Sequence, residues 1–378
     1  MNAQGSTATE CDFIVIGAGM AGLAAAEQLS LDGRVIVLEQ ESSPAFHATG
    51  RSAALFADSY AERNIQCLSR ISRPCFEAPP FAVDGPLLHP RGLLHIRLWD
   101  NLPLPPDDKR AIYPRLDGKD LTDLLPVLNP EAVIEAFYEE PAADIDIHAL
   151  QTALIRELRT RGGQIQLSAK VEVARRIGGR WQVTAGGQTY QAPVVINAGG
   201  AWAGQIATLF GARDPGVSPL RRTAVLVEPP AGMDVTRWPM VVNLEETMFF
   251  KPESGKVMVS PADETPCPPH DAYPEELDVA TAVDRLETVT TLSVRRVVTS
   301  WAGLRTFMPD RLPSIGFDSG VEGFFWLAGQ GGSGIQTAPG QGILTRYIVT
   351  GNAGGLSQAD RDMLIRAFSP ARFDAIAA

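Results

Sequence analysis

Short, fully apolar runs occur near both ends of the chain and in its middle, and each is typical of a strand that is buried on both faces. They are residues 13–16 (FIVI), 35–38 (VIVL), 194–196 (VVI) and 324–328 (FFWLA). Residues 21–29, between the first two runs, are rich in Ala, Leu, Glu and Gln, which favour a helix. This alternation predicts an α/β domain assembled from distant parts of the chain.

The middle of the chain is more polar and predicts a second, antiparallel sheet. This sheet is expected to contain strands at 91–97, 220–228, 240–250 and 257–261. Further strands are expected at 133–138, 164–173, 180–185, 188–193 and 297–303, with Gly-Gly hairpin turns at 178–179 and 186–187. Helices are expected at 61–76, 117–128, 149–161 and 276–292. Prolines predict a fixed loop at 102–108. The fold class that follows is α/β plus α+β, a Rossmann-like domain beside an antiparallel-sheet domain.

Three glycines directly after the first apolar run form a candidate nucleotide-binding turn. Gly17 lets the chain leave the strand sharply, Gly19 lets the backbone approach a pyrophosphate, and Gly22 lets helix and strand pack closely. The start of the next helix then faces the phosphates, where free N–H groups and the helix dipole favour negative charge. Glu39 ends the following strand, where a carboxylate accepts hydrogen bonds from ribose hydroxyls and disfavours the 2′-phosphate of NADP.

Three further segments point to the same kind of ligand. Residues 47–54 (HATGRSAA) offer hydroxyls and, at Arg51, a guanidinium that suits a phosphate or a carboxylate; His47 has no evident partner and is expected to be structural. Residues 194–202 and 324–337 each carry a buried strand into glycines at a helix start. Such a helix N-terminus would stabilise the negative charge that develops on a reduced flavin. Contacts from distant segments favour a flavoprotein over an NAD-dependent dehydrogenase.

The composition narrows the classes of partner. The chain has 378 residues and a formal net charge of −11, which argues against nucleic acid because phosphate binding needs a basic surface. The apolar stretches are too short to span a bilayer, and the N-terminus lacks the basic and apolar regions of a signal peptide. The four cysteines show no metal-ligand spacing. We therefore expect a cytoplasmic protein with reduced thiols, no metal and no transmembrane segment.

Taken together, these motifs resemble the FAD-dependent family of D-amino acid oxidase, glycine oxidase and sarcosine oxidase, and within it the bacterial D-arginine dehydrogenase-like D-amino acid dehydrogenases. The likeness rests on VIGAGMAG at 15–22, VLE at 37–39, HATGRSAA at 47–54, INAGGAWA at 196–203, RR at 221–222, WAGLR at 301–305 and AGQGGSGIQT at 328–337. It implies FAD at the boundary of two domains. The implied FAD-binding domain comprises 1–84, 141–215 and 296–378, and the substrate domain comprises 85–140 and 216–295. The cysteines lie outside the segments expected at the ring, so the FAD is expected to be non-covalent.

The resemblance also implies roles for individual residues. The expected cofactor contacts are Gly17, Gly19, Gly22, Glu39, Gln40, Thr49, Gly50, Arg51, Ser52, Ala53, Val171, Ala198, Gly199, Trp202, Gly303, Gly331, Gly332, Gly334, Ile335, Gln336 and Thr337. Arg305, directly after a buried strand, and Arg222 are expected to hold a substrate carboxylate, which a guanidinium fork matches. Tyr60 corresponds to a tyrosine that covers the pocket in relatives, and Phe249 and Gly332 complete the catalytic set.

Two positions depart from the pattern of the D-arginine dehydrogenase-like proteins. Phe249 stands where they carry a tyrosine, and Leu93 stands where they place an acidic residue for a cationic side chain. Both departures remove polar groups, and a buried polar group that the substrate leaves unmatched is costly. The expected substrate therefore has an uncharged or apolar side chain.

The activity expected from this set is oxidation of a D-amino acid to the imino acid by transfer of a hydride from Cα to flavin N5, with hydrolysis to a 2-oxo acid and ammonia. The arginines lower the barrier by orienting the substrate, and no His, Glu or Lys is expected to act as a base. Two alternatives stay open: oxidation of a secondary amine or 2-hydroxy acid, and a flavin-binding subunit of a larger complex. Chirality, electron acceptor and oligomeric state are not fixed by the sequence.

Overall fold

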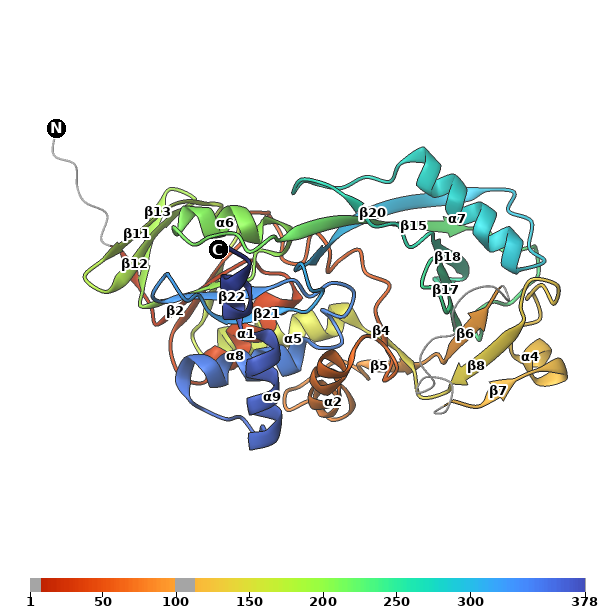
Figure 1. Ribbon diagram of the computed structural model, residues 1–378, viewed down its shortest axis with the longest axis horizontal. Helices are drawn as coiled ribbons and strands as arrows, with labels where there is room; N and C mark the ends of the chain where they lie inside the picture. Colours follow the sequence, from red (N-terminus) through yellow and green to blue (C-terminus); the bar gives the residue numbers. More distant parts are fainter. Residues whose placement is uncertain (1–7, 99–112, 378) are drawn as a thin grey trace.

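The computed structural model describes residues 8–98 and 113–377 of the chain. The molecule is elongated, and two large sheets, a mostly parallel one and a mostly antiparallel one, lie in its two halves (Figure 1). The loop that the prolines predict at 102–108 lies outside the described residues. Among the described residues, no helix is both long and apolar enough to cross a membrane.

The mostly parallel sheet has six strands, and the apolar runs near both ends of the chain form its centre. Its order is β10 (Gln164–Gln166), β3 (Val35–Leu38), β2 (Phe13–Ile16), β14 (Val194–Asn197), β22 (Phe324–Ala328) and β21 (Ser314–Phe317), and only the last pairing is antiparallel. Every residue of β2, β3 and β22 is buried. The prediction of strands that are covered on both faces is confirmed.

Different layers cover the two faces of this sheet. One face packs against α1 (Met20–Leu29), α2 (Arg63–Glu77), α5 (Ile147–Thr160), α8 (Ala338–Thr350) and α9 (Gln358–Phe368). The other face packs against α6 (Ala203–Leu209), which follows the 3-10 turn Gly200–Trp202, and against a four-stranded sheet in the order β1 (Thr9–Glu10), β13 (Gln188–Ala192), β12 (Arg180–Ala185) and β11 (Val171–Ile177). Side chains of β2 alternate between these two layers, as the period of a strand requires.

The four-stranded sheet tests two predictions made from the sequence. The Gly-Gly turns are confirmed, since Gly178, Gly179, Gly186 and Gly187 all have positive φ. The single strand expected at 164–173 is wrong. Its first part is β10, which pairs with β3, and its last part begins β11 in the other sheet; the chain turns between them at Ser168, whose φ is +52°.

The antiparallel sheet has nine strands within the described residues. Its order is β19 (Thr265–Pro266), β15 (Ser218–Val227), β18 (Lys256–Ser260), β17 (Phe249–Glu253), β16 (Met240–Asn243), β6 (Leu93–Arg97), β8 (Glu135–Glu139) and β7 (Arg115–Leu116), with β20 (Val297–Phe307) also paired to β15. The strand expected at 240–250 is wrong, because the chain reverses inside it. Asn243 holds this reversal: its side-chain oxygen accepts from the Met248 amide at 2.8 Å.

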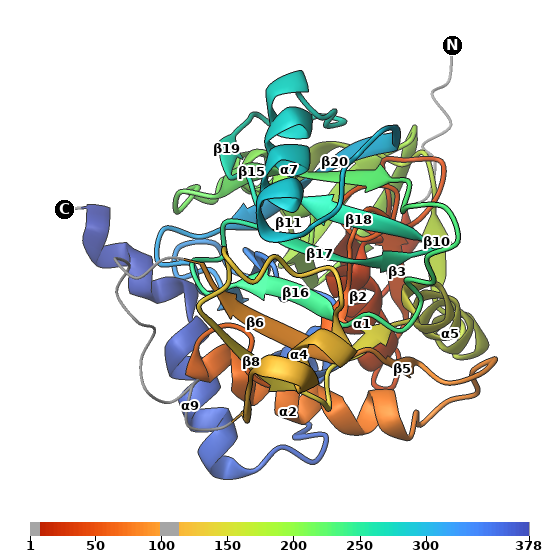
Figure 2. The same cartoon turned by 90° about the vertical axis from the view of Figure 1, so that its right-hand side faces the viewer.

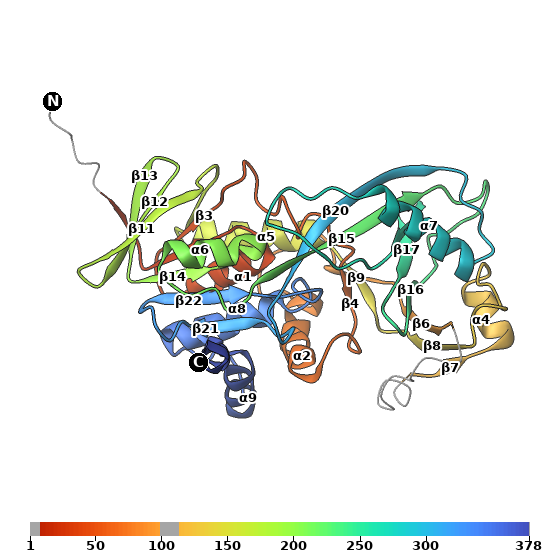
Figure 3. The ribbon, with the colours of Figure 1, turned by 45° about the horizontal axis from the view of Figure 1, so that its top comes forward.

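The outer face of this sheet packs against α7 (Glu276–Val289), and α4 (Gly118–Leu124) lies on the same side (Figure 2). The helix expected at 117–128 is shorter than predicted, because α4 already ends at Leu124. The inner face is turned toward the α/β layers, and the long strands β15 and β20 extend from one part of the molecule to the other (Figure 3). A small sheet of β4 (Leu55–Phe56), β9 (Ala143–Ile145) and β5 (Leu88–Pro90) lies between the two parts, and the turn η2 (Pro370–Ala377) ends the described chain.

Candidate functional site

A long cavity starts at the carboxyl ends of the parallel strands and continues toward the antiparallel sheet. Residues that follow β2, β3, β14 and β22 line it, which is where open α/β sheets bind ligands. Its empty space is about 1840 Å³, including the part that opens to solvent. The cavity therefore joins the segments that the sequence identified separately.

The glycine turn after β2 has the conformation that its sequence predicts. Gly17 has a φ of +102°, and a Cβ at this position would lie 2.5 Å from the Ala198 carbonyl oxygen. A Cβ on Gly22 would collide with the carbonyl oxygen of Gly17, so this glycine allows α1 to start close to β2. Gly17 and Gly19 line the cavity, whereas Gly22 lies behind them.

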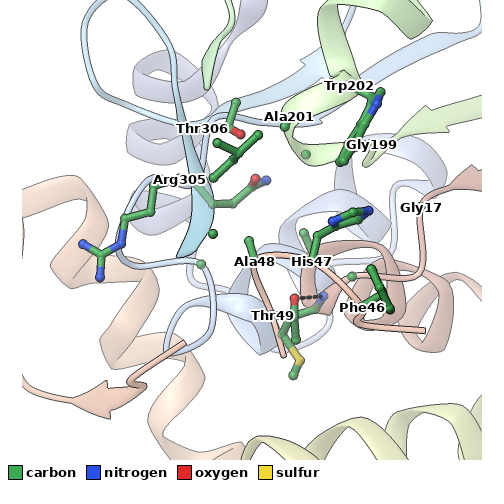
Figure 4. Close-up of a pocket in the computed structure, with 18 of the residues that line it drawn as sticks. Gly17, Phe46, His47, Ala48, Thr49, Gly199, Ala201, Trp202, Arg305 and Thr306 are labelled. Atoms are coloured by element: carbon green, nitrogen blue, oxygen red, sulfur yellow. Dashed lines mark hydrogen bonds between the residues drawn. The ribbon is translucent and has the colours of Figure 1, made fainter. Parts of the chain in front are cut away.

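Glu39 and Thr49 hold the start of α1 in place at this turn. One carboxylate oxygen of Glu39 accepts from the Ala18 amide at 2.6 Å, and the other accepts from the Glu41 amide at 2.9 Å. The Met20 amide donates to the Thr49 hydroxyl at 3.0 Å, the dashed contact in Figure 4. Glu39, Gln40 and Val171 line one end of the cavity. Glu39, the start of α1 and the glycine turn thus lie together at the cavity, where a carboxylate suits the ribose of a dinucleotide and a helix start suits its pyrophosphate.

At the other end, the cavity runs between two glycine-rich segments and the strand β20. Ala198, Gly199, Trp202, Gly303, Gly331, Gly332, Gly334 and Ile335 line this end, as do Ser52 and Ala53. Figure 4 shows Trp202 and His47 on one side and Arg305 on the other. The Gln330 side chain also lines the cavity, and its buried Nε2 has no hydrogen-bond partner among the described residues. An orphaned amide donor here fits a ligand with polar ring atoms.

His47, expected to be structural, also lines this cavity. Its Nε2 lies 2.9 Å from a carboxylate oxygen of Glu41, and its ring centroid lies 4.5 Å from that of Trp202. Both contacts fix the side chain at the cavity wall.

Three further residues expected to contact the cofactor do not line the cavity. Gly50 closes a turn through its amide, which donates to the Ala45 carbonyl at 2.9 Å. Gln336 is buried and donates to the Ser69 hydroxyl at 2.8 Å, and the Thr337 hydroxyl donates to the Ser333 carbonyl at 2.7 Å. These residues support the wall rather than form its surface.

Arg51 lines the cavity, but its guanidinium is engaged by protein groups. It donates to the Ala272 and Ala302 carbonyls, at 3.1 and 2.9 Å, and pairs with Asp271. The hydrogen bond from Arg51 lowers the pKa of the Asp271 carboxyl, which keeps the pair ionised. Arg51 therefore ties the segment 45–53 to β20 and to the loop before α7.

A second cavity lies over the inner face of the antiparallel sheet and opens into the first. Both are lined by Ser52, Ala53, Arg222, Phe249, Arg305 and Gly332. Four of the five residues expected to be catalytic thus lie where the cavities meet, and the fifth, Tyr60, lines the second cavity. A Cβ on Gly332 would collide with the Tyr60 hydroxyl and lie 3.0 Å from Arg305 Nη1, so these three groups converge.

Strand pairing brings the two arginines onto one face. Arg222 on β15 lies opposite Gly303 on β20, and Arg305 lies opposite Leu220. Residues two apart on a strand share a face, so Arg222 and Arg305 are diagonal neighbours. Arg221 is on the other face, where it pairs with Glu275 and, at 2.9 Å, with Asp278. The expectation that Arg305 follows the strand is wrong, because β20 continues to Phe307.

The two guanidiniums differ in their partners. Arg222 Nε donates to the Asp263 carbonyl at 2.9 Å, and its Nη2 lies 3.1 Å from Glu264. Burial, together with the charge of Arg305, lowers the pKa of Arg222 to about 10, so it is charged at neutral pH. Arg305 is half-buried, and its guanidinium makes no hydrogen bond or ion pair with another described residue. A cation placed this way is ready to receive an anion from outside the protein.

One part of the wall of the second cavity is apolar. Leu93, Met240, Val242 and Phe249 line it, and strand pairing places all four on the inner face of the sheet. Leu93 and Phe249, the two departures from the family pattern, are therefore wall residues. Among the described residues, neither places a polar group in this wall.

The second cavity also contains ionisable residues that the sequence did not single out. His95 lines it, with Nε2 3.3 Å from the Ser59 hydroxyl and 3.4 Å from the buried Glu139 carboxylate. Burial raises the pKa of Glu139, but hydrogen bonds from His95 and Ser59 outweigh it, so the pKa lies below its usual value. Glu264 and Arg311 also line this cavity. The expectation that no His, Glu or Lys acts as a base stays a prediction. No sequence motif marks these residues, because tertiary contacts alone bring them together.

Comparison with known proteins gives a family and a fold. The profile of the family described as FAD dependent oxidoreductase (DAO) matches residues 12–348. The mitochondrial dimethylglycine dehydrogenase of Rattus norvegicus is 24% identical over 256 residues, which are 62% of this chain and 30% of that protein. The hydrogen cyanide synthase subunit HcnC of Pseudomonas aeruginosa is 27% identical over 160 residues, 41% of this chain and 36% of that one. The chain thus spans about a third of the length of these relatives.

Glycine oxidase of Geobacillus kaustophilus is 25% identical over 232 residues, 60% of this chain and 59% of that one. Two solved structures resemble the whole chain. L-proline dehydrogenase from P. horikoshii superposes with a TM-score of 0.80 at 18% identity and covers 97% of this chain and 99% of its own. The glycine oxidase structure from G. kaustophilus has a TM-score of 0.76 at 20% identity, with 93% and 98% covered. At these identities the likeness shows the fold.

Proposed function

The chain belongs to the family of FAD-dependent oxidoreductases whose profile matches residues 12–348, and from this premise we propose that it oxidises a D-amino acid with an uncharged or apolar side chain. The product is the imino acid, which water hydrolyses to a 2-oxo acid and ammonia. The observation that carries the proposal is the Arg305 guanidinium, which has no partner among residues 8–98 and 113–377 and lies beside Arg222 and the Tyr60 hydroxyl where the two cavities meet. A guanidinium pair matches a carboxylate and fixes its orientation.

The first cavity fits FAD, and we assign its walls to the parts of the cofactor. Glu39 and the glycine turn would hold the ribose and pyrophosphate, and Gln330 and residues 331–335 would hold the ring. When bound, FAD supplies the acceptor for the two electrons that leave the substrate. The protein's part is to hold the carboxylate on Arg222 and Arg305, so that Cα is oriented toward the first cavity, and to cover the site with Tyr60.

The sheets suggest how the chain divides between these tasks. The expected FAD-binding domain, 1–84, 141–215 and 296–378, contains all six strands of the parallel sheet, and the expected substrate domain, 85–140 and 216–295, contains eight strands of the antiparallel one. The ninth, β20, pairs with β15 over almost its whole length. We therefore propose that the boundary expected at 296 lies after Phe307.

The apolar wall supports the choice of side chain. A charged side chain next to Leu93, Val242 and Phe249 would lose its hydration without gaining a partner from them. The chirality rests on the sequence resemblance, and L-proline dehydrogenase shares this fold. The first experiment must therefore separate D- from L-substrates.

That experiment is anaerobic mixing of the FAD-loaded protein with D- and L-amino acids, N-methyl amino acids and 2-hydroxy acids, followed by flavin absorbance at about 450 nm. Bleaching by apolar D-amino acids is the expected result, and the return of colour in air would identify oxygen as an acceptor. Bleaching only by L-amino acids would overturn the chirality.

Two other outcomes have support in the relatives. Dimethylglycine dehydrogenase is named for a tertiary, N-methylated amine and glycine oxidase for a primary one, so the family includes N-alkylated substrates and a secondary amine is the second candidate. HcnC is named as a subunit, and a protein that carries FAD but is bleached by no compound in the panel would favour that role.

Leu93 offers a test of the side-chain assignment. Leu93→Glu should lower kcat/KM for apolar D-amino acids about tenfold, because an apolar side chain would leave the new buried carboxylate without a partner. It should raise kcat/KM for D-lysine and D-arginine, whose cations can pair with that carboxylate. Leu93→Gln is the matched control, since it has nearly the same shape without the charge. Equal effects of both variants on D-lysine would refute the assignment of this wall to the substrate side chain.

The pKa of Arg222 gives a pH dependence with a defined sign. Burial and Arg305 lower this pKa to about 10, so Arg222 stays charged up to pH 9 and loses charge as the pH rises through about 10. The Kd of a carboxylate without an amine, such as propionate, should be constant from about pH 6 to 9 and rise above about pH 10. Titration of the flavin spectrum measures it. A Kd that rises already between pH 7 and 8 would contradict this role for Arg222.

A further inference from the structure

One carboxylate in the second cavity is shared between two guanidiniums. Glu264 Oε1 lies 3.1 Å from Arg222 Nη2 and 2.8 Å from Arg311 Nη2, and its Oε2 lies 3.0 Å from Arg311 Nη1. All three side chains line the cavity, together with Arg305. Arg222 therefore already has an anionic partner of the same chemical kind as the substrate's carboxylate.

Several contacts hold Glu264 in this position. Arg311 binds it through both terminal nitrogens, the two-point geometry that fixes a carboxylate most firmly. The Arg311 guanidinium lies 4.0 Å from the centre of the Phe307 ring, a cation–π contact. The backbone of Arg311 has a φ of +63°. On the other side, the Asp263 carboxylate accepts from the Thr223 amide at 2.6 Å. The Glu264 carboxylate is thus held by Arg311 in the turn after β20 and by Arg222 on β15, and the neighbouring Asp263 is also bound to β15.

We propose that Glu264 is an internal competitor for the substrate's carboxylate, and that Arg311 sets how strongly it competes. In the free enzyme Glu264 partly neutralises Arg222. When the substrate binds, its carboxylate takes over Arg222 and Arg305 while Arg311 retains Glu264. This inference rests on the proposed function, because it assumes that Arg222 and Arg305 receive a carboxylate.

The charges make the two members of the ion pair act in opposite directions. Removing the charge of Glu264 takes a negative group away from the anion site, so an incoming carboxylate binds more tightly. Removing the charge of Arg311 frees Glu264 to pair with Arg222 alone, so the carboxylate binds more weakly. If the pair served only to hold the loop in place, both substitutions would loosen the site and weaken binding.

The experiment measures the Kd of propionate, which has a carboxylate but no amine, from the change in the flavin spectrum of the FAD-loaded protein. Glu264→Gln should lower the Kd and Arg311→Met should raise it, each by roughly three- to tenfold at low salt, with smaller changes at high salt. The matched control is Glu228→Gln, which also removes one negative charge; Glu228 pairs with Lys256 just beyond the end of β15. It should leave the Kd unchanged.

The substrate's steady-state constants provide a second readout. KM should follow the propionate Kd in each variant, while kcat changes less than about twofold, because the competition precedes the chemical step. A higher propionate Kd in both Glu264→Gln and Arg311→Met would overturn the inference and leave a structural role. If propionate leaves the flavin spectrum of the unchanged protein unperturbed at every concentration, the carboxylate site of the proposed function fails, and the inference fails with it.

Discussion

Replacing Arg305 with methionine is expected to lower kcat/KM by about two to three orders of magnitude while the protein keeps its FAD. Truncating one member of a buried, hydrogen-bonded charge pair costs about 2–5 kcal/mol, and under the proposed function the partner that is lost is the substrate's carboxylate. The fold should be unaffected, because the side chain of Arg305 makes no hydrogen bond or ion pair with another described residue and the backbone pairing with β15 remains. Removing its charge also relieves the repulsion that lowers the pKa of Arg222.

Steady-state kinetics measure the loss of kcat/KM, and flavin absorbance measures how much FAD the variant retains. Arg305→Lys keeps the charge but loses the planar fork, so it should lie between the unchanged protein and Arg305→Met. Arg221→Met is the matched control on the opposite face of the sheet. It loses the contacts to Glu275 and Asp278, so it should lower thermal stability and leave KM unchanged. An Arg305→Met variant with normal kcat/KM would exclude Arg305 as the carboxylate anchor.

Gly17→Ala should yield a colourless protein. The φ of +102° is strained for any residue with a Cβ, and that Cβ would lie 2.5 Å from the Ala198 carbonyl oxygen. Relieving this contact requires β2 and β14 to separate at the point where both end at the cavity. The expected result is loss of FAD on purification, and the ratio of flavin to protein absorbance measures it.

Gly187→Ala separates backbone strain from the effect on the site. Gly187 also has a positive φ, +73°, but a Cβ there would have no atom within 4 Å. This variant should lose about 1–2 kcal/mol of stability from strain and keep its FAD. If Gly17→Ala and Gly187→Ala are equally yellow, the glycine turn does not govern cofactor binding.

The sequence predicts most reliably where burial dictates composition. The strands at 13–16, 35–38 and 324–328 are covered on both faces, so each is an unbroken apolar run that few other structures accommodate. Prediction fails where the chain turns without a turn signal. Residues 244–248 (LEETM) contain no Gly or Pro, yet they separate β16 from β17.

The residues of the candidate site also differ in whether the sequence predicts them. Gly17, Glu39 and Arg305 belong to local motifs, and the structure places each of them at a cavity. Glu264 and His95 belong to no motif. Glu264 becomes relevant through Arg222 and Arg311, which are distant in sequence, and His95 through Ser59 and Glu139. Pairings of this kind depend on strand register and loop path, which a single sequence does not encode locally.

The long first cavity has a consequence for the biosynthesis of the protein. Its walls come from residues near 17–53, 169–171, 198–206, 303–306 and 330–335, so nearly the whole chain must fold before the cavity closes. A nascent chain that has emerged only as far as β15 has the glycine turn but lacks Gln330 and β20. Because residues 330–335 form a wall, FAD gains its full set of contacts only after the chain has been made past them, and the supply of FAD from that stage on decides how many folded chains its binding stabilises.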